Sequence, residues 1–217
     1  MNYQLVLDET LKKLKGVPKL LLHVCCAPCS SYVLEYLSNY FEITVFYYNP
    51  HIDTVEEYIK RRNESERFTK NFKTKYPVKF VGLEHLQDEY MDRINGLENE
   101  REGGIRCFEC YELRLEKACK YAIMNNFDFF TTTLTISPLK NSIKINEIGC
   151  KLEEKYGIRY LYSDFKKKEG YKRSIILSHQ YELYRQNYCG CKYSKRGIHD
   201  ERKIKETNII SDESRIW

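Results

Sequence analysis

The chain has 217 residues, of which 42% are hydrophobic, and its 36 Lys and Arg outnumber its 31 Asp and Glu to give a net charge of +5. This length and hydrophobic content can fill one core, and the mild charge permits a polyanionic partner without requiring one. A membrane-spanning protein is excluded, because no apolar run reaches the roughly 18 residues that cross a bilayer. Residues 1–15 mix charged and apolar side chains, unlike a signal peptide, so we expect a soluble, cytoplasmic protein.

Short apolar runs alternate along the chain with longer segments whose apolar residues lie three and four positions apart. In chain order, the predicted elements are a strand at 20–24, a helix at 30–38, a strand at 43–48, a helix at 54–72, a strand at 78–82, a helix at 108–125, a strand at 128–134, a helix at 142–156, a strand at 159–162 and a helix at 171–186. This alternation predicts an α/β fold with a parallel sheet and helices on both faces. We expect residues 1–197 to form a single α/β domain and the charge-rich residues 198–217 to form a loosely docked or partly disordered tail.

Nine cysteines are the most informative feature of the composition. A reducing compartment keeps thiols from pairing, so clustered cysteines there indicate metal binding rather than a disulfide framework. Seven of the nine fall into three tight groups, which are Cys25, Cys26 and Cys29; Cys107 and Cys110; and Cys189 and Cys191. The other two, Cys119 and Cys150, lie alone inside predicted helices and are expected to be small core residues.

The first two groups lie where predicted helices begin. Cys25 directly follows the first predicted strand, and the two-residue gap between Cys107 and Cys110 lets both sulfurs bind one centre. A helix N-terminus offers unpaired N–H groups and a partial positive charge, which stabilise thiolates. In the third group, Gly190 separates the two thiols and allows a sharp turn around a metal. Because sites in such sheets lie at the carboxyl ends of strands, we expect the groups to meet there.

The spacing leaves the metal open, because zinc and iron–sulfur centres both take cysteine thiolates. Seven thiolates exceed the four ligands of one tetrahedral ion, so either two centres exist or some thiols are spectators. Iron is favoured because the adjacent Cys25 and Cys26 can serve two neighbouring centres, and because the groups come from distant parts of the chain. Zinc and a purely thiol-based redox role are the alternatives.

Four ordered blocks carry a family resemblance: HVCCAPC at 23–29, RCFECYELR at 106–114, TTTLTISP at 131–138 and YRQNYCGC at 184–191. They resemble the cobalamin-independent epoxyqueuosine reductases of the QueH type. The resemblance implies the last step of queuosine synthesis, in which the epoxide of epoxyqueuosine, at the wobble position of tRNA, becomes an alkene. It also implies a fold related to the nucleotide-binding PP-loop-like (HUP) domains. The first loop carries cysteines in place of a Gly-rich phosphate cradle, so we do not expect ATP use.

The resemblance further implies a [4Fe-4S] cluster beside a second iron ion. Cys107, Cys110, Cys29 and one of Cys25 and Cys26 would hold the cluster, and the other of that pair would hold the second iron with Cys189 and Cys191. No flavin or nicotinamide fingerprint is visible, so an external electron donor is expected.

The remaining candidate residues are chosen by position. His51, Asp53 and Tyr111, with Glu57, follow the second predicted strand or flank a cysteine group and are candidate proton donors. The candidate substrate contacts are Ser137 and Lys140, at the end of the fourth strand, and Arg185, beside the last cysteines. Two other functions stay open at this point: an iron–sulfur tRNA thiolation enzyme, and a non-catalytic zinc-stabilised RNA-binding module.

Overall fold

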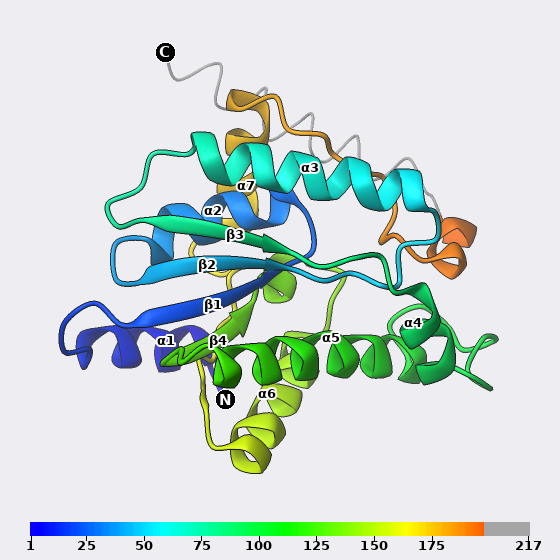
Figure 1. The fold of residues 1–217 in the computed structure, drawn as a ribbon, viewed down its shortest axis with the longest axis horizontal. Helices are drawn as coiled ribbons and strands as arrows, with labels where there is room; N and C mark the ends of the chain where they lie inside the picture. Colours follow the sequence, from blue (N-terminus) through cyan, green and yellow to red (C-terminus); the bar gives the residue numbers. More distant parts are fainter. Residues whose placement is uncertain (198–217) are drawn as a thin grey trace.

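The computed structural model describes residues 1–197 and contains a five-stranded sheet in the order β3-β2-β1-β4-β5 (Figure 1). The strands are β1 (Lys19–Val24), β2 (Glu42–Tyr47), β3 (Val78–Gly82), β4 (Phe129–Thr132) and β5 (Arg159–Tyr160). Every neighbouring pair is parallel, as the alternation of strands and helices predicted. The α/β class is therefore confirmed, and the strand order is compatible with the predicted relation to HUP domains. The predicted tail at 198–217 lies outside the described residues.

Helices cover both faces of the sheet, as expected. The α-helices are α1 (Tyr3–Lys12), α2 (Ala27–Leu37), α3 (Val55–Asn71), α4 (Gln87–Arg93), α5 (Ile105–Met124), α6 (Ser142–Tyr156) and α7 (Gly170–Gln180), and the 3-10 helices are η1 (Thr133–Ile136) and η2 (Lys192–Gly197). Helices α2 and α3 lie on one face of the sheet, and α5 and α6 lie on the other (Figure 1). Successive strand side chains point to opposite faces, so Leu20 and Leu22 pack with α2 and α3 while Leu21 packs with α5 and α6. Within residues 1–197, no helix is both long and apolar enough to cross a membrane.

Sequence reasoning missed two helices and placed the end of a third too late. Helix α1 was not predicted, yet Asn2 caps it and Leu7 and Leu11, four positions apart, are buried in the core. The short helix α4 was also missed, and in it Tyr90 is the buried residue. The last predicted helix continued to residue 186, but α7 ends at Gln180 and Glu182 follows with a positive φ of 50°.

The sheet places the first cysteine group at a topological switch point. Strand β1 pairs with β2 on one side and with β4 on the other, so the connections that leave β1 and β4 diverge at their carboxyl ends. Ligands of open α/β sheets bind in the crevice at such a point. Cys25 directly follows β1 and Thr133 directly follows β4, and the Cys25 backbone N–H donates to the Thr133 hydroxyl at 3.4 Å.

Candidate metal centre

The three thiols of the first group lie together. The Sγ atoms of Cys25, Cys26 and Cys29 all lie within 4.8 Å of one another, and those of Cys25 and Cys26 are 3.8 Å apart. Cys26 is the N-cap residue of α2 and Pro28 follows in the first turn, so no capping side chain occupies the helix N-terminus beside the sulfurs. The three thiols are close enough to bind one metal ion.

The other two groups converge on the same place. One cavity of about 120 Å³ is lined by Cys25, Cys29, Cys107 and Cys189, which represent all three groups. Cys110 and Cys191 are buried together in a small core with Tyr90. Burial raises the pKa of Cys110 to about 12, and the neighbouring thiolate charges of Cys189 and Cys191 add to that effect. The structure therefore brings residues of all three groups to one cavity, and among residues 1–197 the thiols that lie within 4.8 Å of one another are those of Cys25, Cys26 and Cys29.

The adjacent thiols Cys25 and Cys26 have different surroundings. The Cys25 side chain lines the cavity, and its sulfur lies 3.7 Å from the Thr133 hydroxyl. The Cys26 side chain is buried outside the lining, and the Gln186 side-chain amide donates to its sulfur at 3.0 Å. Hydrogen bonds from the Cys26 and Cys29 thiols lower the pKa of Cys25 well below its ordinary value, whereas the bond to Cys25 raises the pKa of Cys26 to about 12. Of the three, Cys25 is therefore the thiol that ionises most readily.

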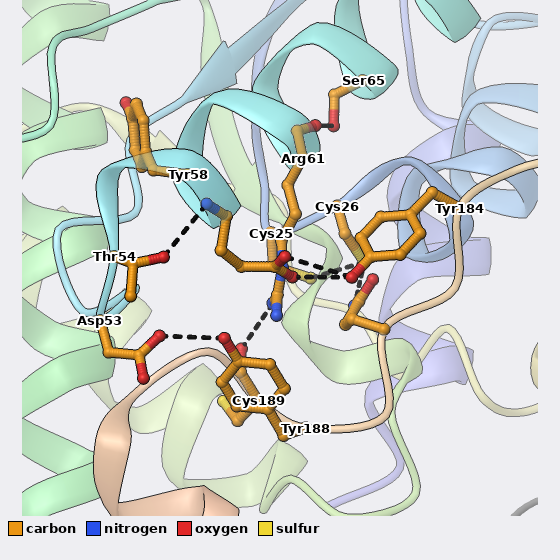
Figure 2. Close-up of polar contacts among 12 residues, drawn as sticks. Cys25, Cys26, Asp53, Thr54, Tyr58, Arg61, Ser65, Tyr184, Tyr188 and Cys189 are labelled. Carbon is orange, nitrogen blue, oxygen red and sulfur yellow. Dashed lines mark hydrogen bonds and ion pairs between the residues drawn. The ribbon is translucent and has the colours of Figure 1, made fainter.

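The Cys189–Gly190–Cys191 turn is held by α3 and by the segment that precedes it (Figure 2). Arg61 Nη1 donates to the Cys189 carbonyl at 3.0 Å, and His51 Nε2 does so at 3.4 Å. Gly190 has a φ of +130°, and a Cβ atom there would lie 3.0 Å from Ile52 Cγ1 and 3.2 Å from Arg61 Nη1. Glycine is therefore required at this position for its backbone conformation and for the close approach of α3.

Two of the predicted proton donors, Asp53 and Glu57, act in this attachment. The Asp53 N–H donates to the Gly190 carbonyl at 2.9 Å, and its carboxylate accepts from the Tyr188 hydroxyl at 2.9 Å. Glu57 pairs with Arg61 Nε at 2.6 Å and accepts from the Tyr184 hydroxyl at 3.1 Å (Figure 2). Neither carboxylate lines the cavity.

The other predicted site residues do line the cavity: His51, Tyr111, Ser137, Lys140 and Arg185. Burial and the positive charges of Arg114 and Arg61 lower the pKa of His51 well below its ordinary value, so its imidazole is neutral at pH 7. Burial opposes the charge of Lys140, but the thiolates of Cys189 and Cys25 outweigh it and raise the pKa of Lys140, so its ammonium persists. Whether these residues donate protons or bind substrate stays a prediction.

Sequence reasoning missed Arg114 and Gln186, although both stand inside the four quoted blocks. Arg114 is fully buried, lines the cavity and donates from Nε to the Cys110 carbonyl at 3.2 Å. It lies four and seven positions after Cys110 and Cys107, which places all three on one helix face, and this spacing was a usable signal. Gln186 had no such signal, because its contact with Cys26 joins distant segments.

The two solitary cysteines differ. Cys119 lies on the core side of α5 and is fully buried, as predicted. For Cys150 the same prediction was wrong, because it is half-buried and its sulfur lies 3.5 Å from a carboxylate oxygen of Glu154. Its position on α6 faces the helix surface more than the core, since Gly149 and Leu152 take the inward positions.

The cavity lining also contains a polar group that suits an anionic centre. Arg114 lines the cavity, and its Nη2 is buried and has no hydrogen-bond partner among residues 1–197. Buried donors normally have partners, so an unsatisfied guanidinium N–H group beside clustered thiols calls for an acceptor of negative charge. Thiolates and inorganic sulfides are such acceptors. The donor set therefore fits a thiolate-held metal centre.

Comparisons with known proteins all point to the same family. The sequence profile of the family described as "Epoxyqueuosine reductase QueH" matches residues 20–197. Relatives with that name include a Streptococcus pyogenes serotype M1 protein, 42% identical over 90% of this chain and 79% of its own length. The Staphylococcus epidermidis relative is 41% identical over 91% of this chain and 87% of its own length. The Thermotoga maritima relative is 34% identical over 80% of this chain and 88% of its own length.

Proposed function

The chain belongs to the epoxyqueuosine reductase QueH family, a family of oxidoreductases, and on this premise we propose that it reduces epoxyqueuosine in tRNA to queuosine. The reaction adds two electrons and two protons to the epoxide and yields an alkene and water. The observation that carries the proposal is the convergence of three distant cysteine groups on one cavity at the switch point of the sheet.

We propose that the seven thiols hold a [4Fe-4S] cluster and a second iron ion. Cys107, Cys110 and Cys29 with one of Cys25 and Cys26 would hold the cluster, and the remaining thiol would hold the iron with Cys189 and Cys191. The positions support this scheme, since Cys25 faces the cavity while Cys26 lies behind it. When bound, these groups supply single electrons and a Lewis acid for the epoxide oxygen. An external donor must deliver the electrons.

The lining residues would bind the substrate and supply protons. Burial raises the pKa of Tyr111, so its hydroxyl stays protonated and can donate to the departing oxygen. Asp53 lies outside the lining, but it accepts a hydrogen bond from Tyr188, which lines the cavity, so a proton role for Asp53 would pass through that hydroxyl. The neutral His51 would orient the Cys189 turn through its Nε2, and its Nδ1, which has no partner among residues 1–197, would exchange a proton with the substrate. Ser137, Lys140 and Arg185 would contact the substrate nucleotide.

One assay separates this function from the iron–sulfur thiolase. Anaerobic, reduced protein is incubated with tRNA that contains epoxyqueuosine, and the digested nucleosides are measured by mass spectrometry. We expect the mass of one oxygen to be lost. Gain of sulfur, with a need for an activating nucleotide, would establish thiolation instead.

A second measurement separates an enzyme from a zinc-stabilised RNA-binding module. Protein purified without oxygen should be brown and contain acid-labile sulfide. Cys107→Ala or Cys110→Ala should remove the colour, whereas Cys150→Ala, at a half-buried thiol outside the cavity, should keep it. Colourless wild-type protein with stoichiometric zinc would exclude the redox function.

A further inference from the structure

Arg114 joins two of the cysteine groups through neutral groups alone. Its Nε donates to the Cys110 carbonyl at 3.2 Å, and its Nη1 donates to the Asn49 side-chain oxygen at 3.2 Å. The Asn49 amide donates in turn to the carbonyl of Val24, the residue before Cys25, at 2.9 Å. The guanidinium therefore ties the end of β1 to the first turns of α5.

The positive charge of Arg114 has no carboxylate partner among residues 1–197, although its side chain is fully buried. A buried charge is costly unless it is paired, so the pairing must come from another anion. The contrast is Arg61, an equally enclosed guanidinium that Glu57 neutralises at 2.6 Å. Glu102 also lines the cavity, but it is exposed and forms no ion pair with Arg114.

The groups that surround Arg114 in the cavity include the thiols of Cys25, Cys107 and Cys189. Thiols lose their protons when they bind a metal, so these side chains become anions in the metal-bound form. The Nη2 group is buried and without a partner, and the side chain lines the cavity that the thiols share. Because Arg114 is fully buried, its charge cannot serve the phosphates of a nucleic acid that passes over the surface.

We propose that Arg114 is a positioning residue whose charge balances the negative charge of the thiolate-held centre and raises its reduction potential. The inference rests on the proposed function. A fixed positive charge stabilises the reduced form, which carries one more negative charge, and hydrogen bonds to sulfur act in the same direction. The low polarity around a fully buried guanidinium strengthens both effects.

The test compares variants that separate charge from structure. Arg114→Gln removes the charge and keeps an amide donor. Arg114→Lys keeps the charge and loses the planar guanidinium group with its several N–H donors. The matched control is the double variant Glu57→Gln with Arg61→Gln, which removes a buried guanidinium bonded to a cysteine carbonyl without changing the net charge. Each protein is loaded anaerobically with ferrous iron and sulfide, and iron, sulfide and midpoint potential are measured.

Arg114→Gln should shift the reduction equilibrium at least tenfold toward the oxidised form, which is 59 mV for a one-electron couple. Arg114→Lys and the double variant should each shift it less than threefold. A wild-type potential in loaded Arg114→Gln, or an equal shift in the double variant, would overturn the inference. If Arg114→Gln does not fold or load, Arg114→Lys decides: loading with a wild-type potential supports the charge role, and failure to load shows a purely structural one.

The two proposals fail in different ways. Wild-type protein that holds no iron and sulfide would overturn both, and this result is read without any variant. Loaded wild-type protein that leaves epoxyqueuosine unchanged would contradict only the proposed reaction. Loaded, active Arg114→Gln with a raised KM, an unchanged kcat and an unchanged potential would overturn the inference alone, because Arg114 would then act on the substrate.

Discussion

At the scale of single residues, Gly190 is the position where the smallest change should have the largest effect on the site. Gly190→Ala places a Cβ atom 3.0 Å from Ile52 Cγ1 and 3.2 Å from both Arg61 Nη1 and His51 Nε2, at a φ of +130°. We expect the turn to shift away from α3, and Cys189 with it, so that bound iron per chain falls severalfold. Metal analysis after anaerobic loading measures this.

A matched control is Gly157→Ala at the end of α6. Gly157 has a φ of +74°, but nothing lies within 4 Å of an added Cβ atom. The left-handed conformation alone should cost about 1 kcal/mol of unfolding free energy. Iron content should be unchanged, so equal iron loss in both variants would show that a general loss of stability, and not the local contact, matters.

The clustered thiols could be predicted from the sequence, whereas most of the side chains that hold them in place could not. Cys25 and Cys107 could be placed because local spacing showed a helix start after a strand or a loop. Gln186 and Arg61 reach Cys26 and Cys189 across 160 and 128 positions of sequence, and no periodicity reports contacts of that length. Asp53 and Glu57 were chosen for their position beside the site, and the structure adds their attachment to Tyr188 and Tyr184.

At the scale of elements, Glu116 links α5 to α6. Its carboxylate accepts from the Tyr156 hydroxyl and pairs with Lys155 at 3.3 Å and Lys120 at 3.2 Å. Burial opposes its ionisation, but the hydrogen bonds from Tyr156, Lys120 and Lys155 prevail and lower the pKa of Glu116 to about 2. The ionised form is therefore favoured in the folded chain.

This shift gives a pH-dependent prediction for Glu116→Gln. A lowered folded-state pKa stabilises the protein above the unfolded value, about 4.5, and the contribution is lost as the pH falls toward about 2. After allowance for solvent screening, the variant should lose about 1 to 2 kcal/mol at pH 7. Urea unfolding should show that the difference in unfolding free energy between wild type and variant shrinks as the pH falls from 4.5 to 2. A difference that does not change with pH would mean that the variant loses packing instead of charge.

The elements also show where pattern reasoning reaches its limit. The central strands were predicted closely because continuous apolar runs are typical of strands buried on both faces. Helix α1 was missed because its few buried residues stand among charges, and its stability comes from packing on the core. The end of α7 was misplaced because Leu183 closes the helix through its N–H bond to the Ser178 carbonyl, a local turn without Gly or Pro.

At the scale of the whole molecule, the distribution of positive charge matters more than the net charge of +5. The conspicuous lysine run at 166–168 is partly neutralised, since Lys166 pairs with Asp164 and Lys168 with Asp8, each at 2.7 Å. Lys140 and Arg185 line the cavity that holds the thiols, where the substrate nucleotide would bind. We therefore expect the substrate RNA to be held at the cavity rather than along the lysine run.

The salt dependence of tRNA binding tests this expectation. Each phosphate contact adds about 0.7 to 1 to the slope of log affinity against log salt concentration. Arg185→Gln should weaken binding and reduce the slope by about that amount. Lys168→Gln, which removes a cation already paired with Asp8, should leave the affinity and the slope unchanged. The measurement is the fluorescence anisotropy of labelled tRNA across a potassium chloride series, with metal content matched between variants. A reduced slope for Lys168→Gln and an unchanged one for Arg185→Gln would place the RNA on the lysine run instead.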